Sequence, residues 1–300
     1  MSVFKKNYDR HTHMRGRAGN ATLSRSHAGN FCVFLFLLIV GAFMALPLVY
    51  TLVQSVKPTE ELFTYPPKFY VKNPTFDNFK QAFQLAGNLW VPFTRYLFNS
   101  VFIAVVGTGV YILVASLAAY PMAKAKRLPG MAFISQLIVW TLLFRTEVTA
   151  IPQYVVIAKL GMVNTYWSIL LPALAGTFGV FLMRQFMVSA IPDAILEAAR
   201  IDGANEYKIF WSISMPCVKP AWMTLIIFTF QSLWSATGGT YIYEESMRML
   251  PNVLSQIAAG GIARTGAGSA VAVIIMIPPI IVFLISQSSV METMAQSGIK

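Results

Sequence analysis

Residues 191–216 read IPDAILEAARIDGANEYKIFWSISMP and separate two long apolar stretches of the chain. Proline is favoured in the first turn of a helix and glycine directly after its end, so Pro192 and Gly203 bound a first short helix. Asn205 can cap a second helix, which Pro216 then ends. The segment therefore predicts a helix–turn–helix in a chain that is otherwise dominated by apolar residues.

The first of these helices has two different faces. Three charged residues recur at the spacing of neighbours on one helix face, namely Asp193, Glu197 and Arg200. A smaller apolar face lies beside them and consists of Ala194, Ala198 and Ile201. Small side chains allow another surface to approach closely, and the Glu197 carboxylate can pair with an arginine on that surface. A solvated amphipathic elbow on a bilayer fits the same residues equally well, so their pattern leaves both interpretations open.

The overall composition indicates that much of this chain lies in lipid. Of its 300 residues, 56% are hydrophobic and 12% are charged, whereas soluble proteins carry about 25% charged residues. All three histidines precede residue 30, which excludes histidine-based catalysis and most zinc chemistry from the apolar body. No Walker A motif occurs in the sequence, so the chain is not itself an ATPase.

Uncharged stretches predict an all-α integral membrane protein with six transmembrane helices. These are Phe31–Val53, Leu97–Tyr120, a third that begins at Met131 and is interrupted by Arg145 and Glu147 before Val148–Ala158, Tyr166–Met183, one within Pro220–Tyr243 and one within Thr265–Met291. Lysine and arginine are more numerous on the side of the N-terminus, so both termini are predicted to be cytoplasmic. Between the first two spans, residues 77–83 predict a short amphipathic helix, which either lies in the outer interface or docks an external partner.

The stretch at residues 191–216 resembles a segment of a known protein family. Glu197-Ala198-Ala199, Gly203 and Ile213-x-Met215-Pro216 have the spacing of the EAA loop of type I ABC importer permeases, E-A-A-x3-G-x9-I-x-L-P. The one departure is methionine at position 215, where the pattern has leucine.

Two further stretches, residues 151–166 and 73–83, are similar to segments of the sugar-importing, maltose-permease-like branch of that family. The likeness covers nearly the whole chain after residue 30. Residues 233–239 and 145–147 depart from the branch where spans could line a pathway. The resemblance therefore implies the fold of a type I ABC importer transmembrane domain and a sugar or oligosaccharide as solute, without identifying the solute.

The resemblance also implies an organisation for the chain. Residues 1–30 would be a basic cytoplasmic tail, predicted from its composition to be disordered, and residues 31–95 the first transmembrane helix with an outer segment. Residues 96–287 would be the permease core, with its coupling loop at 184–219, and residues 288–300 a second cytoplasmic tail. Because the body is so apolar, the basic tail is assigned to a membrane protein and not to a nucleic-acid binder.

A permease of this family carries out no chemistry, so no catalytic residue, metal or cofactor is expected. The resemblance implies ABC ATPase subunits that hydrolyse ATP, a second permease subunit (a paralogue), an extracytoplasmic solute-binding protein, and a multi-pass location in the lipid of a bacterial cytoplasmic membrane. The EAA helix of the family lies in a groove on the ATPase. Carried over to this sequence, the coupling site comprises Glu197, Ala198, Ala199, Arg200, Asp202, Gly203, Ile213 and Pro216.

Polar residues inside spans are candidates for the translocation path. They are Arg145, Glu147, Gln153, Gln231 and Trp234. Tryptophan and glutamine bind sugars by ring stacking and by hydrogen bonds to hydroxyl groups. Structural roles compete with this interpretation: Arg145 and Glu147 can snorkel or pair with a neighbour, and Trp234 can anchor a span end at the membrane interface.

Other functional classes fit the sequence less well. A self-contained secondary transporter or channel, the alternative reading, would place acidic ion sites in the spans and show an internal repeat. The spans carry almost no acid besides Glu147, and no convincing repeat is present. A membrane enzyme would need a nucleophile with a base, or a metal site, within the spans.

Overall fold

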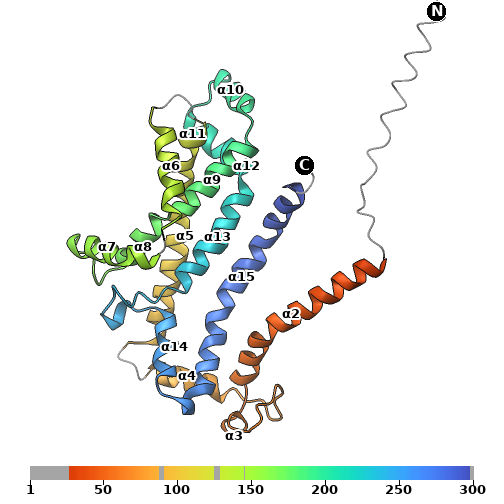
Figure 1. Ribbon diagram of the computed structural model, residues 1–300. Coiled ribbons are helices and arrows are strands. Elements are labelled where there is room, and N and C mark those ends of the chain that lie inside the picture. Colours follow the sequence, from red (N-terminus) through yellow and green to blue (C-terminus); the bar gives the residue numbers. More distant parts are fainter. Residues whose placement is uncertain (1–26, 88–90, 125–128, 145, 298–300) are drawn as a thin grey trace, which may run out of the picture. The chain divides into compact units, whose positions relative to one another are not determined.

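The computed structural model describes residues 27–87, 91–124, 129–144 and 146–297, and these are helices joined by turns and short loops (Figure 1). Strands are absent from these ranges, in agreement with the predicted all-α class. The chain divides into two units, residues 1–50 and 51–300. Most of the predicted disordered tail, residues 1–26, and the last three residues of the predicted C-terminal tail lie outside the described residues.

The first unit consists, in its described part, of most of α2 (His27–Ser55). This helix is apolar on all sides, and nearly every side chain of residues 29–50 is exposed. A helix that is apolar all round requires lipid or another apolar surface around it. It corresponds to the first predicted span.

The second unit begins with the last turn of α2 and contains the remaining helices. They are α3 (Thr59–Leu62), α4 (Asp77–Gly87), α5 (Phe93–Lys124), α6 (Met131–Thr141), α7 (Thr146–Lys159), α8 (Trp167–Leu174), α9 (Thr177–Ala190), α10 (Asp193–Ile201), α11 (Glu206–Ile209), the π-helical turn η1 (Phe210–Ser214), α12 (Met215–Cys217), α13 (Lys219–Trp234), the 3-10 turn η2 (Glu245–Met247), α14 (Leu250–Ala258), the 3-10 turn η3 (Ile262–Arg264) and α15 (Thr265–Ser297).

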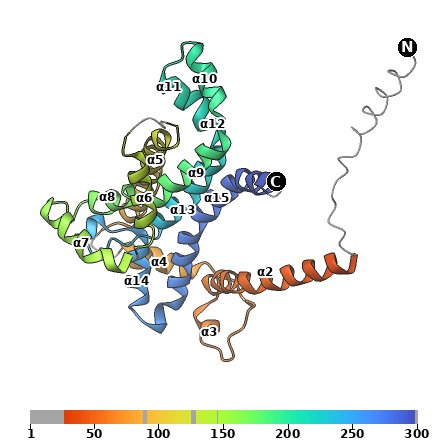
Figure 2. The same cartoon turned by 45° about the horizontal axis from the view of Figure 1, so that its top comes forward.

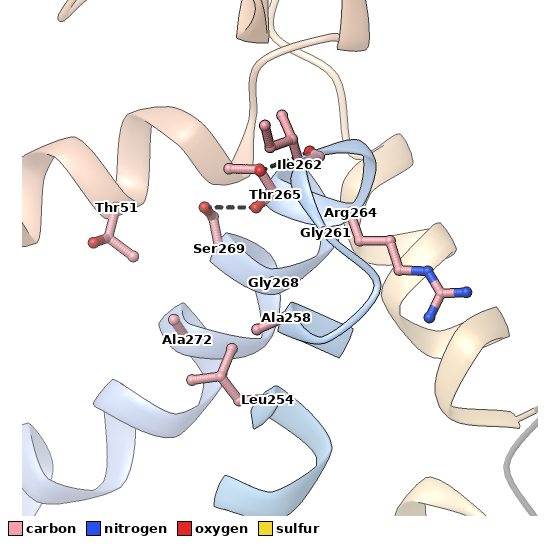
Figure 3. Close-up of a pocket in the computed structure, with 10 residues that line it drawn as sticks. All are labelled: Thr51, Leu254, Ala258, Gly261, Ile262, Arg264, Thr265, Gly268, Ser269 and Ala272. Carbon is pink, nitrogen blue, oxygen red and sulfur yellow. Dashed lines mark hydrogen bonds between the residues drawn. The ribbon is translucent and has the colours of Figure 1, made fainter. Parts of the chain in front are cut away.

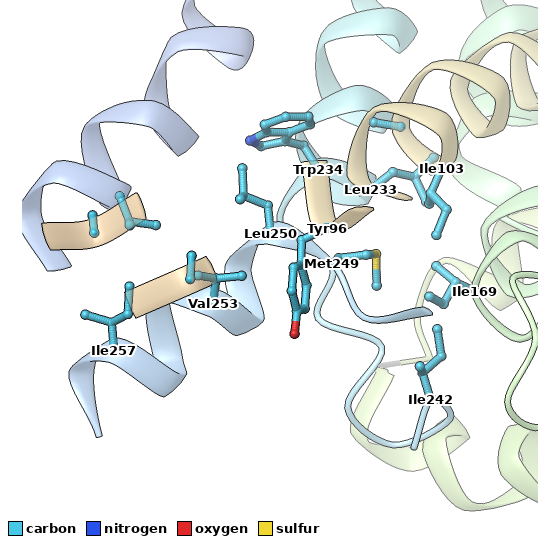
Figure 4. Close-up of a cluster of buried hydrophobic side chains, with 14 of the residues drawn as sticks. Tyr96, Ile103, Ile169, Leu233, Trp234, Ile242, Met249, Leu250, Val253 and Ile257 are labelled. Carbon is cyan, nitrogen blue, oxygen red and sulfur yellow. The ribbon is translucent and has the colours of Figure 1, made fainter. Parts of the chain in front are cut away.

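Helix α5 is the centre of the second unit and packs along α9 and α13, while α15 packs on the other side of α13. Two clusters of buried side chains hold these helices. One surrounds Trp234 and Tyr96 and includes residues of α14 and α15 (Figure 4). The other, called the inner cluster because the coupling loop is predicted to lie on the inner face, joins the ends of α5, α9 and α13 next to that loop to α10 and α11. Figure 1 shows α10 and α11 at one end of the unit and α4 and α14 at the other.

The predicted short helix between the first two spans is present as α4. Its buried Asn78 donates from Nδ2 to the backbone oxygens of Ser55 (3.0 Å) and Lys57 (2.6 Å), which fastens α4 to the last residue of α2 and to the turn after it. Gly266 of α15 lies directly against the Asn78 side chain, because a Cβ added to this glycine would be 2.3 Å from Asn78 Oδ1. The phenylalanines at this helix are only partly used for packing, because Phe76 and Phe83 are exposed.

Four helical stretches in the described residues are long and apolar enough to cross a membrane: Gly29–Ser55, Phe93–Lys124, Trp167–Ala190 and Ile262–Ser288. The fifth predicted span corresponds to α13, which reaches sufficient length only together with residues 206–217, and the two parts are bent by 77°. The described residues thus hold four or five such stretches, so six spans and cytoplasmic termini remain predictions.

The third predicted span is broken into two helices, α6 and α7. The described part of the break is residues 142–144, beside the charges that interrupt the apolar run. Figures 1 and 2 show α7 and α8 running across the direction of α5 and α9. Polar and charged residues at the break therefore mark a change in chain direction and not a continuous span.

Candidate functional site

Helix α10 forms where the sequence predicts it. Pro192 precedes it in an extended conformation, Asp193 lies in its first turn, and Asp202 follows its last residue, with its N–H donating to Ala198 O (3.0 Å). Gly203 has a left-handed φ of 79°, and the N–H of Ala204 bonds to Ala199 O (3.0 Å). Glycine adopts this conformation without a steric penalty, which explains why the helix ends here.

The second predicted helix is more irregular than the sequence indicates. Asn205 caps α11 by accepting the Lys208 N–H at 2.8 Å, as predicted. The chain then passes through the π-helical turn η1, which contains Ile213, and continues through α12. The prediction that Pro216 ends the helix is wrong, because proline is compatible with a first helical turn and the break comes at Val218.

One edge of α10 is attached to the rest of the unit. Leu196 is its only buried residue and packs in the inner cluster with Ala123 of α5, Met187 of α9 and Ile209 of α11. Ala199 is partly buried against the same cluster. The apolar attachment of the helix therefore depends on a narrow strip of its surface.

The opposite face of α10 is free. At about 100° per residue, Ala194, Ala198 and Ile201 point away from Leu196, and Glu197 lies at the side of the helix between the two; all four are exposed. Ile201 is 86% exposed. Among the residues that the structure describes, none forms a hydrogen bond or an ion pair with the Glu197 side chain. The face combines a carboxylate, small side chains and one large apolar side chain, and the described part of the chain supplies no partner for its carboxylate.

Two charged residues of α10, Asp193 and Arg200, are bonded by residues outside the EAA pattern. Lys124 Nζ donates to Asp193 Oδ1 (2.8 Å) and to the backbone oxygen of Ile191. Glu206 accepts from Arg200 Nε on one oxygen (2.7 Å) and from the Tyr120 hydroxyl on the other (2.8 Å). The hydrogen bond to Glu206 raises the pKa of Arg200, so the guanidinium stays charged.

Sequence reasoning missed Tyr120, Lys124 and Glu206 as contacts of α10. Tyr120 and Lys124 are more than 65 residues away from their partners, so local spacing carries no information about these contacts. The one available signal was that Tyr120 and Lys124 are four residues apart at the end of a predicted span and therefore share a face of that helix.

The candidate path residues do not form one site. Gln153 lines a pocket of about 580 Å³ at the breaks between α6 and α7 and between α8 and α9, with Thr141, Pro172 and Gly176 among its other lining residues. Its Nε2 donates to the Tyr241 hydroxyl at 3.1 Å. Gln231 lines a separate pocket of about 230 Å³ between α13 and α15.

The remaining path candidates have other surroundings. Trp234 is 1% exposed, donates from Nε1 to Ile275 O (2.8 Å) and stacks on Phe230, so it belongs to the core between α13 and α15. Glu147 is exposed in the first turn of α7. Arg145 lies outside the described residues.

A third pocket, of about 540 Å³, borders the start of α15 and contains none of the predicted site residues (Figure 3). Its hydroxyl groups are already bonded: Thr265 donates to Ile262 O (2.7 Å) and Ser269 to Thr265 O (2.9 Å). Figure 3 shows the Arg264 side chain directed away from these two residues. Within the described ranges, no group of three His, Cys, Asp or Glu side chains could hold a metal ion.

Comparison with known proteins identifies the family. Residues 125–294 match the family described as binding-protein-dependent transport system inner membrane component. Protein LplC of Bacillus subtilis is 31% identical over 79% of this chain and 79% of its own length. The polygalacturonan/rhamnogalacturonan transport system permease protein YtcP, also from B. subtilis, is 28% identical over 84% of this chain and 91% of its own.

The fold has a solved counterpart. A chain of a bacterial ABC transporter involved in the import of the acidic polysaccharide alginate superimposes with a TM-score of 0.74 at 23% identity, over 88% of this chain and 98% of that one. The likeness shows that the two chains share a fold. The chain therefore belongs to the family of binding-protein-dependent inner-membrane transport components and is a multi-pass permease subunit of an ABC importer, which works with separate ATPase subunits, a second permease subunit and a solute-binding protein.

Proposed function

We propose that α10 is the helix through which this permease subunit contacts an ATPase subunit. The observation that carries the proposal is the free face of α10, formed by Ala194, Glu197, Ala198 and Ile201. These residues lie opposite the edge that attaches the helix to its own chain. The free face includes Glu197 and Ala198 of the EAA pattern, while Ala199 and Arg200 lie toward the attached edge.

The chemistry of this face suits a groove on another protein. Ile201 exposes most of its side chain, and burying an isoleucine against a partner contributes about 1.5–3 kcal/mol. Two alanines permit close approach without loss of side-chain entropy. A carboxylate without an intramolecular partner can accept a bidentate contact from an arginine of the ATPase. Gly203 and Asp202 shape the turn after α10, and Ile213 packs the following segment against the inner cluster. Pro216 is exposed in the next helical turn, α12.

We further propose that the solute is a saccharide. The support is the name of the relative YtcP and the resemblance of residues 73–83 and 151–166 to the sugar-importing branch. Gln153 and Gln231 are the residues of this chain that we propose to line the path, because each borders a pocket next to a helix break or a proline. Glu147 lies in the first turn of α7, directly after the first of these breaks, and Arg145, two residues before it in the sequence, is proposed to border the path as well.

The same proposal extends to the assembly. Residues 96–287 form the permease core, six spans place both termini in the cytoplasm, and the second permease subunit is a paralogue. A transporter purified through a tag on this chain would then contain a different permease polypeptide. Liposomes that hold this transporter and its binding protein would accumulate galacturonan oligosaccharides only when ATP is supplied on the ATPase side.

Exchange of Glu197 tests the docking proposal. Glu197→Lys places a cation where we propose that an arginine of the ATPase binds, so recovery of the ATPase with the tagged permease should fall at least about tenfold, as expected for about 1.4 kcal/mol. Glu244→Lys, a matched exchange in the loop that follows α13, should leave recovery unchanged. Full recovery of the ATPase with Glu197→Lys at equal membrane abundance would refute docking through this face.

A further inference from the structure

We propose that Tyr120, Lys124 and Glu206 are positioning residues that make α10 and the inner end of α5 move as one body when the ATPase moves α10. This inference rests on the proposed function of α10 and adds the route by which its motion enters the membrane. Lys124 of α5 and Glu206 of α11 bond directly to α10, and Tyr120 of α5 is joined to it through Glu206. These contacts lie on the attached edge of α10, away from the face proposed to meet the ATPase.

Apolar packing alone does not fix the orientation of α10. Leu196 is its single buried side chain, and a helix held at one point can pivot about that point. The polar contacts lie at its two ends: Asp193 in the first turn bonds to Lys124, and Arg200 in the last turn is joined through Glu206 to Tyr120. Two contacts one helix length apart suppress the pivot.

Both contacts end on the same face of α5. Tyr120 and Lys124 are one turn apart, so a displacement of α10 pulls or pushes the same side of the α5 helix. The Lys124 side chain is only 6% exposed, so water screens its pairing with Asp193 less than it would screen a surface pair. The Tyr120 ring packs edge-on against the Phe210 ring, with 5.4 Å between the ring centroids, and this packing orients the Tyr120 hydroxyl toward Glu206.

Helix α5 carries this displacement to a candidate solute pocket. Nine residues before Tyr120, the Tyr111 hydroxyl donates to Gly176 O (3.0 Å) and accepts from Gly179 N (2.8 Å) at the break between α8 and α9. A Cβ added to Gly179 would lie 2.4 Å from this hydroxyl, so α5 and the break are in direct contact. Gly176 also lines the pocket of Gln153. The chain of contacts therefore runs from α10 through α5 to that pocket.

Spin-label distances in the purified transporter, with its ATPase and second permease subunits, test this inference. In a Cys32→Ser, Cys217→Ser background, one label pair joins Ile195→Cys on α10 to Val106→Cys on α5, and a second joins Ile195→Cys to Phe283→Cys on α15. Each pair is measured without nucleotide and with ATP and vanadate. In the otherwise unmodified chain, the α10–α15 distance should change by about 2–5 Å, whereas the α10–α5 distance should stay constant.

The double variant Tyr120→Phe, Lys124→Met removes the hydroxyl and the ammonium while retaining side-chain volume. Its α10–α5 distance should now shift on addition of ATP and vanadate, with unchanged ATPase recovery and unchanged distances in the absence of nucleotide. A loss of folding alone would broaden both distances before nucleotide is added. The matched control Tyr65→Phe, Lys80→Met makes the same chemical changes at exposed positions and should behave like the unmodified chain.

A constant α10–α5 distance in the double variant would overturn the inference. So would an α10–α5 distance that changes with nucleotide in the unmodified chain. An α10–α15 distance that does not change with nucleotide in the unmodified chain would overturn it as well. Loss of the ATPase from the double variant would overturn it too, because the contacts would then serve docking. Glu197→Lys reports on docking separately. If that variant keeps its ATPase, the docking proposal fails, while the distances still decide whether α10 and α5 move together.

Discussion

Helices α10 and α13 follow each other closely in the chain but are held in opposite ways. The 16-residue α13 buries Ala221, Leu225, Phe230, Leu233 and Trp234 among apolar side chains. The 9-residue α10 buries Leu196 alone and is fixed by hydrogen bonds and ion pairs at its ends. Substitutions in α13 should therefore act on folding, whereas substitutions on α10 should act on contacts with other subunits.

The largest expected effect is on the α13 side of this comparison. Trp234→Ala removes a fully buried side chain and its stacking on Phe230, so the free energy of unfolding should fall by about 3–5 kcal/mol. Thermal unfolding in detergent, followed by circular dichroism, measures the effect. Trp167→Ala, at a position that is 57% exposed, is the control and should shift the midpoint little. Equal shifts for both variants would mean that Trp234 does not belong to the core.

A smaller effect, of a different kind, is expected directly after α10. Gly203→Val forces valine into a left-handed φ of 79°, at a cost of roughly 1–2 kcal/mol. The turn should change direction and reduce recovery of the ATPase severalfold, with little change in the unfolding midpoint. Asparagine tolerates this conformation, so Gly203→Asn should retain the ATPase. Identical recovery with both variants would show that the left-handed turn is unimportant for docking.

The smallest expected effects distinguish two lysine–aspartate pairs. Lys124→Met removes a nearly buried ammonium that bonds to Asp193 and to a backbone oxygen, and should lower the free energy of unfolding by about 1–2 kcal/mol. Lys80→Met breaks a pair whose side chains are both 75% exposed and should leave the unfolding midpoint unchanged. Chemical denaturation of both variants checks this order, and a larger effect of Lys80→Met would reverse it.

The sequence predicts α10 well because its limits depend on local chemistry. Pro192 restricts the backbone and Gly203 permits a left-handed turn, neither with the help of a distant contact, and Asn205 caps α11 with its own side chain. The all-α class follows equally directly from long apolar runs. The spacing of the EAA pattern supplies the family.

The parts that sequence reasoning missed depend on distant contacts. The π-helical turn at Phe210–Ser214 has no recognisable residue pattern. The helix is interrupted at Val218, two residues beyond Pro216, which was expected to end it. Trp234 looks like an interface residue in the sequence, but a hydrogen bond to α15 places it in the core. Tyr120 and Lys124 meet their partners only after the inner segment has folded back on α5.

Photo-crosslinking from the free face of α10 tests most directly whether this helix docks on an ATPase subunit. A benzophenone amino acid at Ile201, in intact membranes, should yield a crosslink to the ATPase subunit. The same residue at Phe283, which is exposed on α15, should yield none. Crosslinks to lipid alone at position 201, in membranes where the ATPase is present in normal amount, would contradict the proposal that α10 docks on it.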